Sequence, residues 1–298
     1  MRTVVGALTL LFFSLNTILW CSVLFLFVIV KLIIPIEGIR DRISRLLVHI
    51  AMCWIDGNSL FFRITHRVQW DVQGIEHLTF EKSYLVVSNH RSWADIFVLQ
   101  HIFNHRIPFL KFFLKQELIW VPFLGIAWWA LDFPFLKRYS RQFLEKHPEL
   151  RGKDMAATRK SCEKFKRLPV SVMNFLEGTR FDFKKHKNQN PPYRHLLLPK
   201  AGGVALVFSS MGEYLSNVLD VTLVYPQNEP PVHFWDLLTG NIPRITVRVR
   251  ILPIPENGVG VTYEEDEVYR KRIQQWVNQL WKEKDQLIED ILTGDNLE

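Results

Sequence analysis

The sequence is poor in cysteine: its 298 residues include three, scattered at Cys21, Cys53 and Cys162. This number and spacing exclude a disulfide framework and a paired-cysteine zinc site, and they favour a reducing compartment for the folded part. The motifs G-x-S-x-G, G-x-G-x-x-G, the P-loop and H-E-x-x-H are missing too. Serine hydrolases with a nucleophile elbow, dinucleotide enzymes, nucleotide hydrolases and zincins are therefore unsupported.

Acidic charge is the scarcer sign, with 30 Asp and Glu against 37 Lys and Arg and a formal net charge of +7. Apolar residues make up 48% of the chain, and the mean hydropathy of +0.03 is high for a water-soluble enzyme. This balance suggests an anionic membrane surface or an anionic substrate. Nucleic acid is the competing interpretation, but zinc-finger spacing, an RNP-like run and a dense Lys/Arg tract are all absent.

Charge is absent altogether from residues 3–30. A membrane span needs about 20 apolar residues, so this run is long enough to cross with tilt. No Ala-x-Ala cleavage site follows it, which favours a retained helix over a cleaved signal peptide. Arg2 precedes the run, whereas four cations follow it, at Lys31, Arg40, Arg42 and Arg45. The positive-inside rule then places the rest of the chain on the cytoplasmic side.

Residues 38–67 predict a second helix, which is basic and amphipathic. Such a helix either lies in the headgroup layer or packs as an ordinary helix, and the sequence leaves both open. We therefore divide the chain into membrane-anchoring helices at 1–66 and an α/β domain at 67–298. The apolar segment 120–136 contains Asp132, which is costly in lipid, so we expect it to be buried or interfacial rather than a second span.

The α/β domain alternates strand-like and helix-like segments, which favours a central sheet flanked by helices. We expect a polar loop at residues 181–194. We expect a long amphipathic helix at residues 266–292. The other expected helices are 92–103, 151–167 and 202–211, and the expected strands are 68–72, 84–88, 108–114, 169–176, 218–224 and 245–252.

The first candidate for chemistry follows the buried strand 84–88. His90 stands at the end of that strand, and Asp95 comes five residues later in the first turn of a helix. An imidazole oriented by a carboxylate is the working part of a general base. The alternative is structural: Ser92 and Asp95 have the spacing of a capping box, and His90 is then a loop histidine.

Further polar groups follow other apolar runs. Glu177-Gly178-Thr179-Arg180 comes directly after the strand 169–176, Lys137-Arg138 follows Phe135-Leu136, and Lys115 ends a similar run. Arg180 can grip a phosphate with two hydrogen bonds, and Gly178 allows close backbone approach. The structural alternative for Glu177–Arg180 is a turn with a solvated Glu–Arg pair and no binding role. Strand ends at one sheet edge would bring the base and these cations together.

These motifs resemble the PlsC family of glycerolipid acyltransferases, which includes lysophosphatidic acid acyltransferase. The resemblance covers residues 68–226, and within the family the chain looks most like the enterobacterial YihG-type proteins. Asp132 stands where the family has a glycine, and Tyr225 where it has a small or branched residue. The matching segments are Asn89-His90 with Asp95 (N-H-x-x-x-x-D), Lys115–Leu118 (K-x-E-L), Phe135–Arg138, Glu177–Arg180 (E-G-T-R) and Val221–Pro226.

The resemblance implies a mixed sheet of the glycerol-phosphate acyltransferase type. It implies transfer of a fatty acyl group from acyl-CoA or acyl carrier protein to a lysophospholipid hydroxyl at the bacterial inner membrane. His90 and Asp95 would be catalytic, no metal or redox cofactor would be needed, and nucleic acid would not be a partner. The acceptor would contact Lys115, Arg138, Glu177, Gly178, Thr179 and Arg180.

Two other functions stay open: a lipid-binding or regulatory protein on a degenerate acyltransferase fold, and a lipid hydrolase in which His90 activates water.

Overall fold

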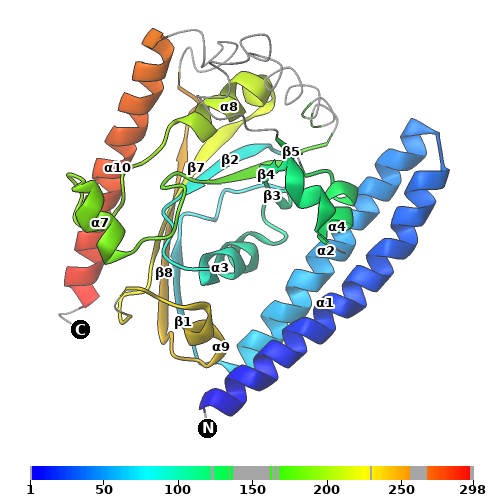
Figure 1. Ribbon diagram of the computed structural model, residues 1–298, viewed down its shortest axis with the longest axis horizontal. Helices are drawn as coiled ribbons and strands as arrows, with labels where there is room; N and C mark the ends of the chain where they lie inside the picture. Colours follow the sequence, from blue (N-terminus) through cyan, green and yellow to red (C-terminus); the bar gives the residue numbers. More distant parts are fainter. Residues whose placement is uncertain are drawn as a thin grey trace.

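The computed structural model describes residues 2–121, 124–133, 135–136, 162, 165, 168–228, 230–255 and 267–295. The helix expected at 151–167 therefore lies almost entirely outside the described residues. Two long N-terminal helices, α1 (Arg2–Ile33) and α2 (Glu37–Thr65), precede an α/β domain (Figure 1). The end of α2 at Thr65 lies close to the boundary proposed at 66, although the division into two domains stays a prediction.

The domain is built on a six-stranded mixed sheet, which confirms the expected fold class. The order across the sheet is β1 (Gln69–Gln73), β8 (Arg244–Leu252), β7 (Asn217–Val224), β2 (Tyr84–Ser88), β6 (Ser171–Phe175) and β3 (Leu110–Phe112). The last four strands run parallel to one another, whereas β8 is antiparallel to β7 and carries β1 beside it. The carboxyl ends of β7, β2 and β6 are consequently neighbours at one edge.

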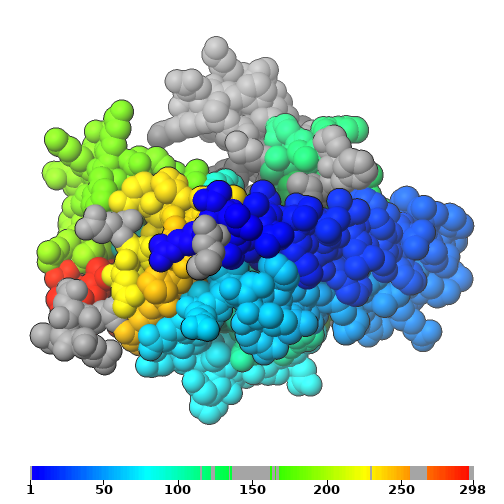
Figure 2. Space-filling view, turned by 90° about the horizontal axis from the view of Figure 1, so that it is seen from below, coloured from blue at the N-terminus to red at the C-terminus, as the bar shows by residue number. Residues whose placement is uncertain are grey.

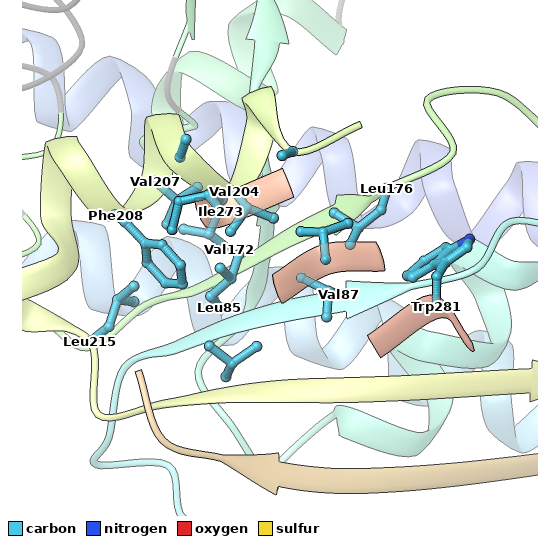
Figure 3. Close-up of a cluster of buried hydrophobic side chains, with 14 of the residues drawn as sticks. Leu85, Val87, Val172, Leu176, Val204, Val207, Phe208, Leu215, Ile273 and Trp281 are labelled. Atoms are coloured by element: carbon cyan, nitrogen blue, oxygen red, sulfur yellow. The ribbon is translucent and has the colours of Figure 1, made fainter. Parts of the chain in front are cut away.

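Alternating side chains of the central strand enter two separate cores, as the pleat requires. Leu85 and Val87 face α8 (Gly202–Met211) and α10 (Glu267–Asp295), where Val204, Phe208 and Trp281 are fully buried (Figure 3). Tyr84 and Val86 face the opposite way, toward α3 (Ala94–Phe103). Helices therefore cover both faces of β2, which explains why this strand is an unbroken apolar run.

The two N-terminal helices form a long hairpin beside the sheet (Figure 1). The amide of Asn16 on α1 donates to Trp54 O and to Asn58 Oδ1 on α2, at 2.9 Å each. In Figure 2, α1 runs in dark blue along one face of the molecule beside α2. Most of its large apolar side chains are exposed, and it is long and apolar enough to cross a membrane.

Both ends of α1 contact the α/β domain. Near its start, Gly6 lies against Trp235 and Thr239 at α9 (Phe234–Leu238), and Arg2 donates to Asn241. At its other end, Lys31 donates to Ala130 O at the end of α4 (Leu124–Ala130). Helix α1 thus contacts the domain at both of its ends, and between them it packs against α2.

The apolar segment 120–136 is not one long helix in its described part. It comprises the end of a 3-10 turn (Gln116–Trp120), the seven-residue α4, and Phe135–Leu136 (β5), which pairs with Leu114–Lys115 (β4). Ala127 and Ala130 pack into a cluster with Leu24 and Leu47 of the N-terminal hairpin. The expectation of a buried or interfacial segment agrees with this packing.

One expected loop is partly helical. Residues 181–194 contain α7 (Phe183–Gln189), whose start is capped by Asp182 through its side-chain bonds to the backbone N–H groups of Lys184 and Lys185. Asn190 ends the helix in the left-handed conformation. The segment 183–189 is nearly all polar, so an apolar stripe is absent and the helix could be identified only by its caps.

Candidate active site

Three adjacent strands of the sheet end in polar side chains at one edge. Tyr225 follows β7, Asn89 and His90 follow β2, and Glu177 lies two residues after the end of β6. Parallel pairing of β2 with both neighbours fixes this juxtaposition, since Ser88 is in register with Val221 and with Phe175. The carboxyl edge of a parallel sheet is where α/β proteins place their ligand sites.

His90 and Asp95 form a buried hydrogen-bonded pair. The imidazole Nδ1 lies 2.8 Å from Asp95 Oδ2, and the carboxylate is fully buried while the imidazole side chain keeps 11% of its exposure. An ionised Asp95 holds the proton on Nδ1, so Nε2 is the nitrogen left to accept another proton. The His90 ring also stacks on Phe175, with 3.9 Å between ring centroids.

Asp95 also helps to start the helix that it belongs to. Its Oδ2 atom accepts the backbone N–H groups of Arg91 at 2.6 Å and Ser92 at 2.9 Å, while Ser92 Oγ accepts the N–H of Ala94. This one carboxylate therefore makes the contacts that both interpretations require, and its role in catalysis stays a prediction. The backbone contacts aim Oδ2 at His90.

Asn89 fastens the end of β2 to β7. Its side-chain amide donates to Leu223 O at 2.8 Å, and its side-chain oxygen accepts the N–H of Leu223 at 2.9 Å. The side chain thereby replaces a backbone pairing at the point where the chain leaves the sheet. This bond fixes the backbone of His90 relative to Tyr225, two residues beyond Leu223.

Glu177 supports His90 from the other side. One carboxylate oxygen accepts the backbone N–H of His90 at 2.8 Å, and the other accepts that of Leu197 at 3.0 Å. The side chain is buried, and this burial raises the pKa of Glu177 to about 7 against the lowering effect of these N–H groups and of Arg91. Phe181 N completes the link between the segments by donating to His90 O at 2.8 Å.

The phenol of Tyr225 reaches the other oxygen of Asp95. Its hydroxyl donates to Oδ1 at 2.7 Å, and both side chains are buried. Burial, reinforced by the adjacent carboxylate, raises the pKa of Tyr225 well above its ordinary value. Arg91 supplies the balancing charge nearby, although burial lowers the pKa of its guanidinium, which lies over the Phe181 ring.

Comparison with known proteins decides the family. The model of the acyltransferase family matches residues 69–225, which is more than half of the chain and holds every strand end described above.

The chain belongs to the acyltransferase family.

It is also similar to curated acyltransferases. It is 26% identical to "1-acyl-sn-glycerol-3-phosphate acyltransferase delta" of Homo sapiens over 223 residues, which are 70% of this chain and 53% of that protein. It is 24% identical to "1-acyl-sn-glycerol-3-phosphate acyltransferase 3" of Arabidopsis thaliana over 227 residues, or 71% and 54% of the two chains. The chain thus spans about half the length of the curated relatives it matches.

A solved structure of similar description is the 1-acyl-sn-glycerophosphate acyltransferase PlsC from Thermotoga maritima. The match has a TM-score of 0.49 and 17% sequence identity, and it covers 94% of this chain and 98% of that one.

The rest of the E-G-T-R segment in this acyltransferase faces solvent. Gly178 adopts a left-handed backbone with φ of +67°, which favours glycine, and Arg180 is exposed with its guanidinium carbon 4.9 Å from the Trp93 ring centre. Thr179 Oγ1 accepts a hydrogen bond of 2.7 Å from Lys185, and the Lys200 side chain lies close to Gly178. We call Arg180, Lys185 and Lys200 the cationic rim.

The two other predicted phosphate ligands are placed only in part. Lys115 lies in β4 opposite Leu136 of β5, so the backbone pairing brings it near the chain that leads to Arg138. Arg138 itself, and the side chain of Lys115, lie outside the described residues. Their roles stay predictions.

Asp132 has a backbone that explains why glycine suits its position. Its φ of +61° is left-handed, a conformation that aspartate tolerates better than most residues. Its carboxylate lies 3.3 Å from Lys31 Nζ, and Lys31 is 4% exposed. The sequence predicted Lys31 as a cation flanking the membrane run. In the structure it is buried against the end of α4 and Asp132.

Sequence reasoning assigned no role to several residues of this edge. It noted Tyr225 only as a departure from the family pattern, and it did not anticipate the buried Arg91 or the bond between Asn89 and Leu223. The available signal was a tyrosine placed at the end of an apolar strand, where a buried hydroxyl needs a partner.

Proposed function

We propose that this protein transfers a fatty acyl group from acyl-CoA or acyl carrier protein to the free hydroxyl of a lysophospholipid. The acceptor is 1-acyl-glycerol-3-phosphate or a related lysophospholipid. The observation that carries the proposal is the buried His90–Asp95 pair at the carboxyl edge of the sheet, 2.8 Å apart, in a chain of the acyltransferase family.

In the proposed reaction, His90 acts as the general base. Its Nε2 atom takes the proton of the acceptor hydroxyl while the oxygen attacks the thioester carbonyl, and Asp95 stabilises the imidazolium that forms. Collapse of the tetrahedral intermediate breaks the carbon–sulfur bond, and the departing thiolate takes the proton from His90. The net products are the acylated phospholipid and a free thiol.

Direct transfer is favoured over an acyl-enzyme. Among the described residues, the imidazole is hydrogen-bonded to Asp95 and to no serine or cysteine. The two hydroxyls closest in sequence are otherwise bonded: Ser88 Oγ donates to Asn89 O, and Ser92 Oγ accepts the N–H of Ala94 at the start of α3. A nucleophile paired with the base, which covalent catalysis needs, is therefore not visible in this part of the chain.

The acceptor phosphate is assigned to the cations around this edge. Arg180 is exposed beside Trp93, within the segment whose Glu177 and Phe181 hold His90. A guanidinium so placed can bind a phosphate through two parallel hydrogen bonds. Lys115 and Arg138 are proposed to complete the phosphate site, and Gly178 and Thr179 to shape its backbone.

The membrane supplies the acceptor. The exposed apolar surface of α1 supports bilayer contact, and the contacts of both its ends with the domain favour a helix that lies in one leaflet over one that crosses. Arg40, Arg42 and Arg45 are exposed on α2, where they suit the anionic headgroup layer. We assign the domain to the cytoplasmic face of the bacterial inner membrane.

The proposal is tested by the product that the wild-type protein makes. Detergent-solubilised protein is incubated with radiolabelled acyl-CoA or acyl carrier protein thioester and a panel of lysophospholipids, and the lipids are separated. We expect label in a diacyl phospholipid that depends on the acceptor. Label in free fatty acid without any acceptor would instead indicate a hydrolase, and no turnover across all donors and acceptors would indicate a lipid-binding protein.

A further inference from the structure

Asp95 is held by more than the histidine and its own helix start. Its Oδ2 atom takes His90 and two backbone N–H groups, whereas its Oδ1 atom takes the Tyr225 hydroxyl at 2.7 Å. Asp95 is fully buried and Tyr225 is 4% exposed. The phenol is therefore a fixed partner of the oxygen that does not face the histidine.

The position of the phenol is set by the fold. Tyr225 packs in the same apolar cluster as Phe97, Leu223 and Val232, which leaves its ring little freedom. Asn89 binds Leu223 through two hydrogen bonds and so ties the chain before Tyr225 to the chain before His90. The hydroxyl is thus aimed at Asp95 whether or not a substrate is present.

The chemical effect of this bond has a definite sign. A phenol whose pKa is raised well above its ordinary value stays protonated and donates to the ionised carboxylate. Donation to Oδ1 draws charge away from Asp95 and weakens its attraction for the proton on His90 Nδ1. The His90 imidazolium is then less stabilised than it would be beside a carboxylate that binds no phenol, so Tyr225→Phe should stabilise the imidazolium.

We propose that Tyr225 is a positioning residue of the transfer reaction, whose phenol fixes the Asp95 carboxylate and competes with His90 for its negative charge. This inference rests on the proposed function, because it assigns Tyr225 a role through the catalytic pair. Tyr225 does not itself touch the reacting atoms.

Other charged groups act on the same pair and are unchanged by a substitution at Tyr225. Arg91 lies near Asp95, Glu177 acts on Asp95 from the segment after β6, and Asp285 of α10 acts on Arg91. From the chain that follows β7, the Tyr225 phenol contacts Asp95. A change in pH profile on removing its hydroxyl therefore reports the Tyr225–Asp95 bond.

The test is the pH dependence of kcat/KM for acyl transfer by Tyr225→Phe in the full-length protein. We expect the acid limb to move to higher pH by about half to one pH unit, and the plateau to fall about tenfold, as for loss of a hydrogen bond to a charged group. The control is Tyr84→Phe, which removes the hydroxyl of another buried tyrosine at the opposite edge of the sheet, where it accepts the N–H of Thr79. It should lower the melting temperature and leave the acid limb in place.

A second variant keeps the test valid if Tyr225→Phe folds poorly. Fluorotyrosine at Tyr225 keeps the shape and is a stronger donor, so it should move the acid limb to lower pH, opposite to phenylalanine. An acid limb unmoved by fluorotyrosine, or moved equally by Tyr84→Phe, would overturn the role of Tyr225. Acyl transfer that survives His90→Ala would overturn the base assignment on which this inference rests. No acyl transfer by the wild-type protein would overturn the proposed function itself, so the failures are distinguishable.

Discussion

The candidate active site at the carboxyl edge of the sheet has a buried interior and an exposed cationic rim, and the two differ in how their side chains are held. His90, Asp95, Glu177 and Tyr225 are buried and bound to one another or to backbone groups at distances of 2.6–3.0 Å. The rim, Arg180 with Lys185 and Lys200, is exposed to solvent.

The groups proposed for proton transfer are thus held in place by hydrogen bonds to the sheet and the loops at its edge. The cations proposed to bind the acceptor phosphate lie at the surface. Variants in the interior should therefore lower kcat, and variants in the rim should raise the KM for the acceptor.

His90→Ala breaks the interior most completely. General-base catalysis contributes about 10²- to 10⁴-fold to such reactions, and we expect acyl transfer to fall by an amount near the upper end. The measurement is the initial rate of phospholipid formation. His77→Ala, an exposed histidine in the loop before β2, is the control and should keep the wild-type rate; a rate for His90→Ala that matched this control would contradict the base assignment.

Asp95→Asn separates orientation of the histidine from capping of the helix. By analogy with the serine-protease aspartate, we expect kcat to fall by about a thousandfold or more. Replacing a cap by alanine costs about 1 kcal/mol, and Asp182→Ala at the start of α7 measures that effect at a carboxylate that bonds backbone N–H groups and no imidazole. If Asp95→Asn lost only stability, as the control does, Asp95 would be a cap and nothing else.

Glu177→Gln should change the pH dependence of stability. The pKa of Glu177 is raised to about 7 in the folded protein, so its contribution to stability is full below the unfolded value and is lost as pH rises toward 7. The loss is on the order of 3 kcal/mol.

Glutamine does not titrate, so the gap in melting temperature between wild type and Glu177→Gln should shrink from pH 4.5 to 8. Melting in detergent at several pH values measures this gap, with exposed Glu76→Gln as the control. A gap that stayed constant or widened with pH would show that Glu177 is not held as described.

Arg180→Ala probes the rim and should have the smallest effect. Exposed, water-screened contacts are weaker than buried ones, so we expect the acceptor KM to rise about tenfold with little change in kcat. Titrating the lysophospholipid at saturating donor measures both. Arg272→Ala, an exposed arginine on α10, is the control. Unchanged kinetic constants for Arg180→Ala would argue against a phosphate contact.

The buried interior also shows what can be predicted from sequence. β2 was readable from its apolar run and has the expected bounds, Tyr84–Ser88, because both of its faces are covered by helices. The contact between His90 and Asp95 could be predicted too, because Asp95 follows His90 by five residues, in the first turn of α3.

Contacts between distant segments could not be predicted in the same way. Tyr225 meets Asp95 across 130 residues, and Lys31 meets Asp132 across 101, so neither pair leaves a local pattern. Glu177 matched a family motif, but its bonds to the backbone of His90 and Leu197 depend on how β2 and β6 pair. The sequence thus indicated His90, Asp95 and Glu177 as candidate site residues, whereas their hydrogen bonds to distant segments depend on the order of the strands.

The most direct test of the account compares two acceptors with one donor. Release of free thiol from the acyl thioester is followed with a lysophospholipid and with the analogue that has hydrogen in place of the free hydroxyl. If His90 activates that hydroxyl for direct transfer, thiol is released with the lysophospholipid and not with the deoxy analogue. Equal release with both would mean that water or an enzyme group receives the acyl chain, and would contradict the account.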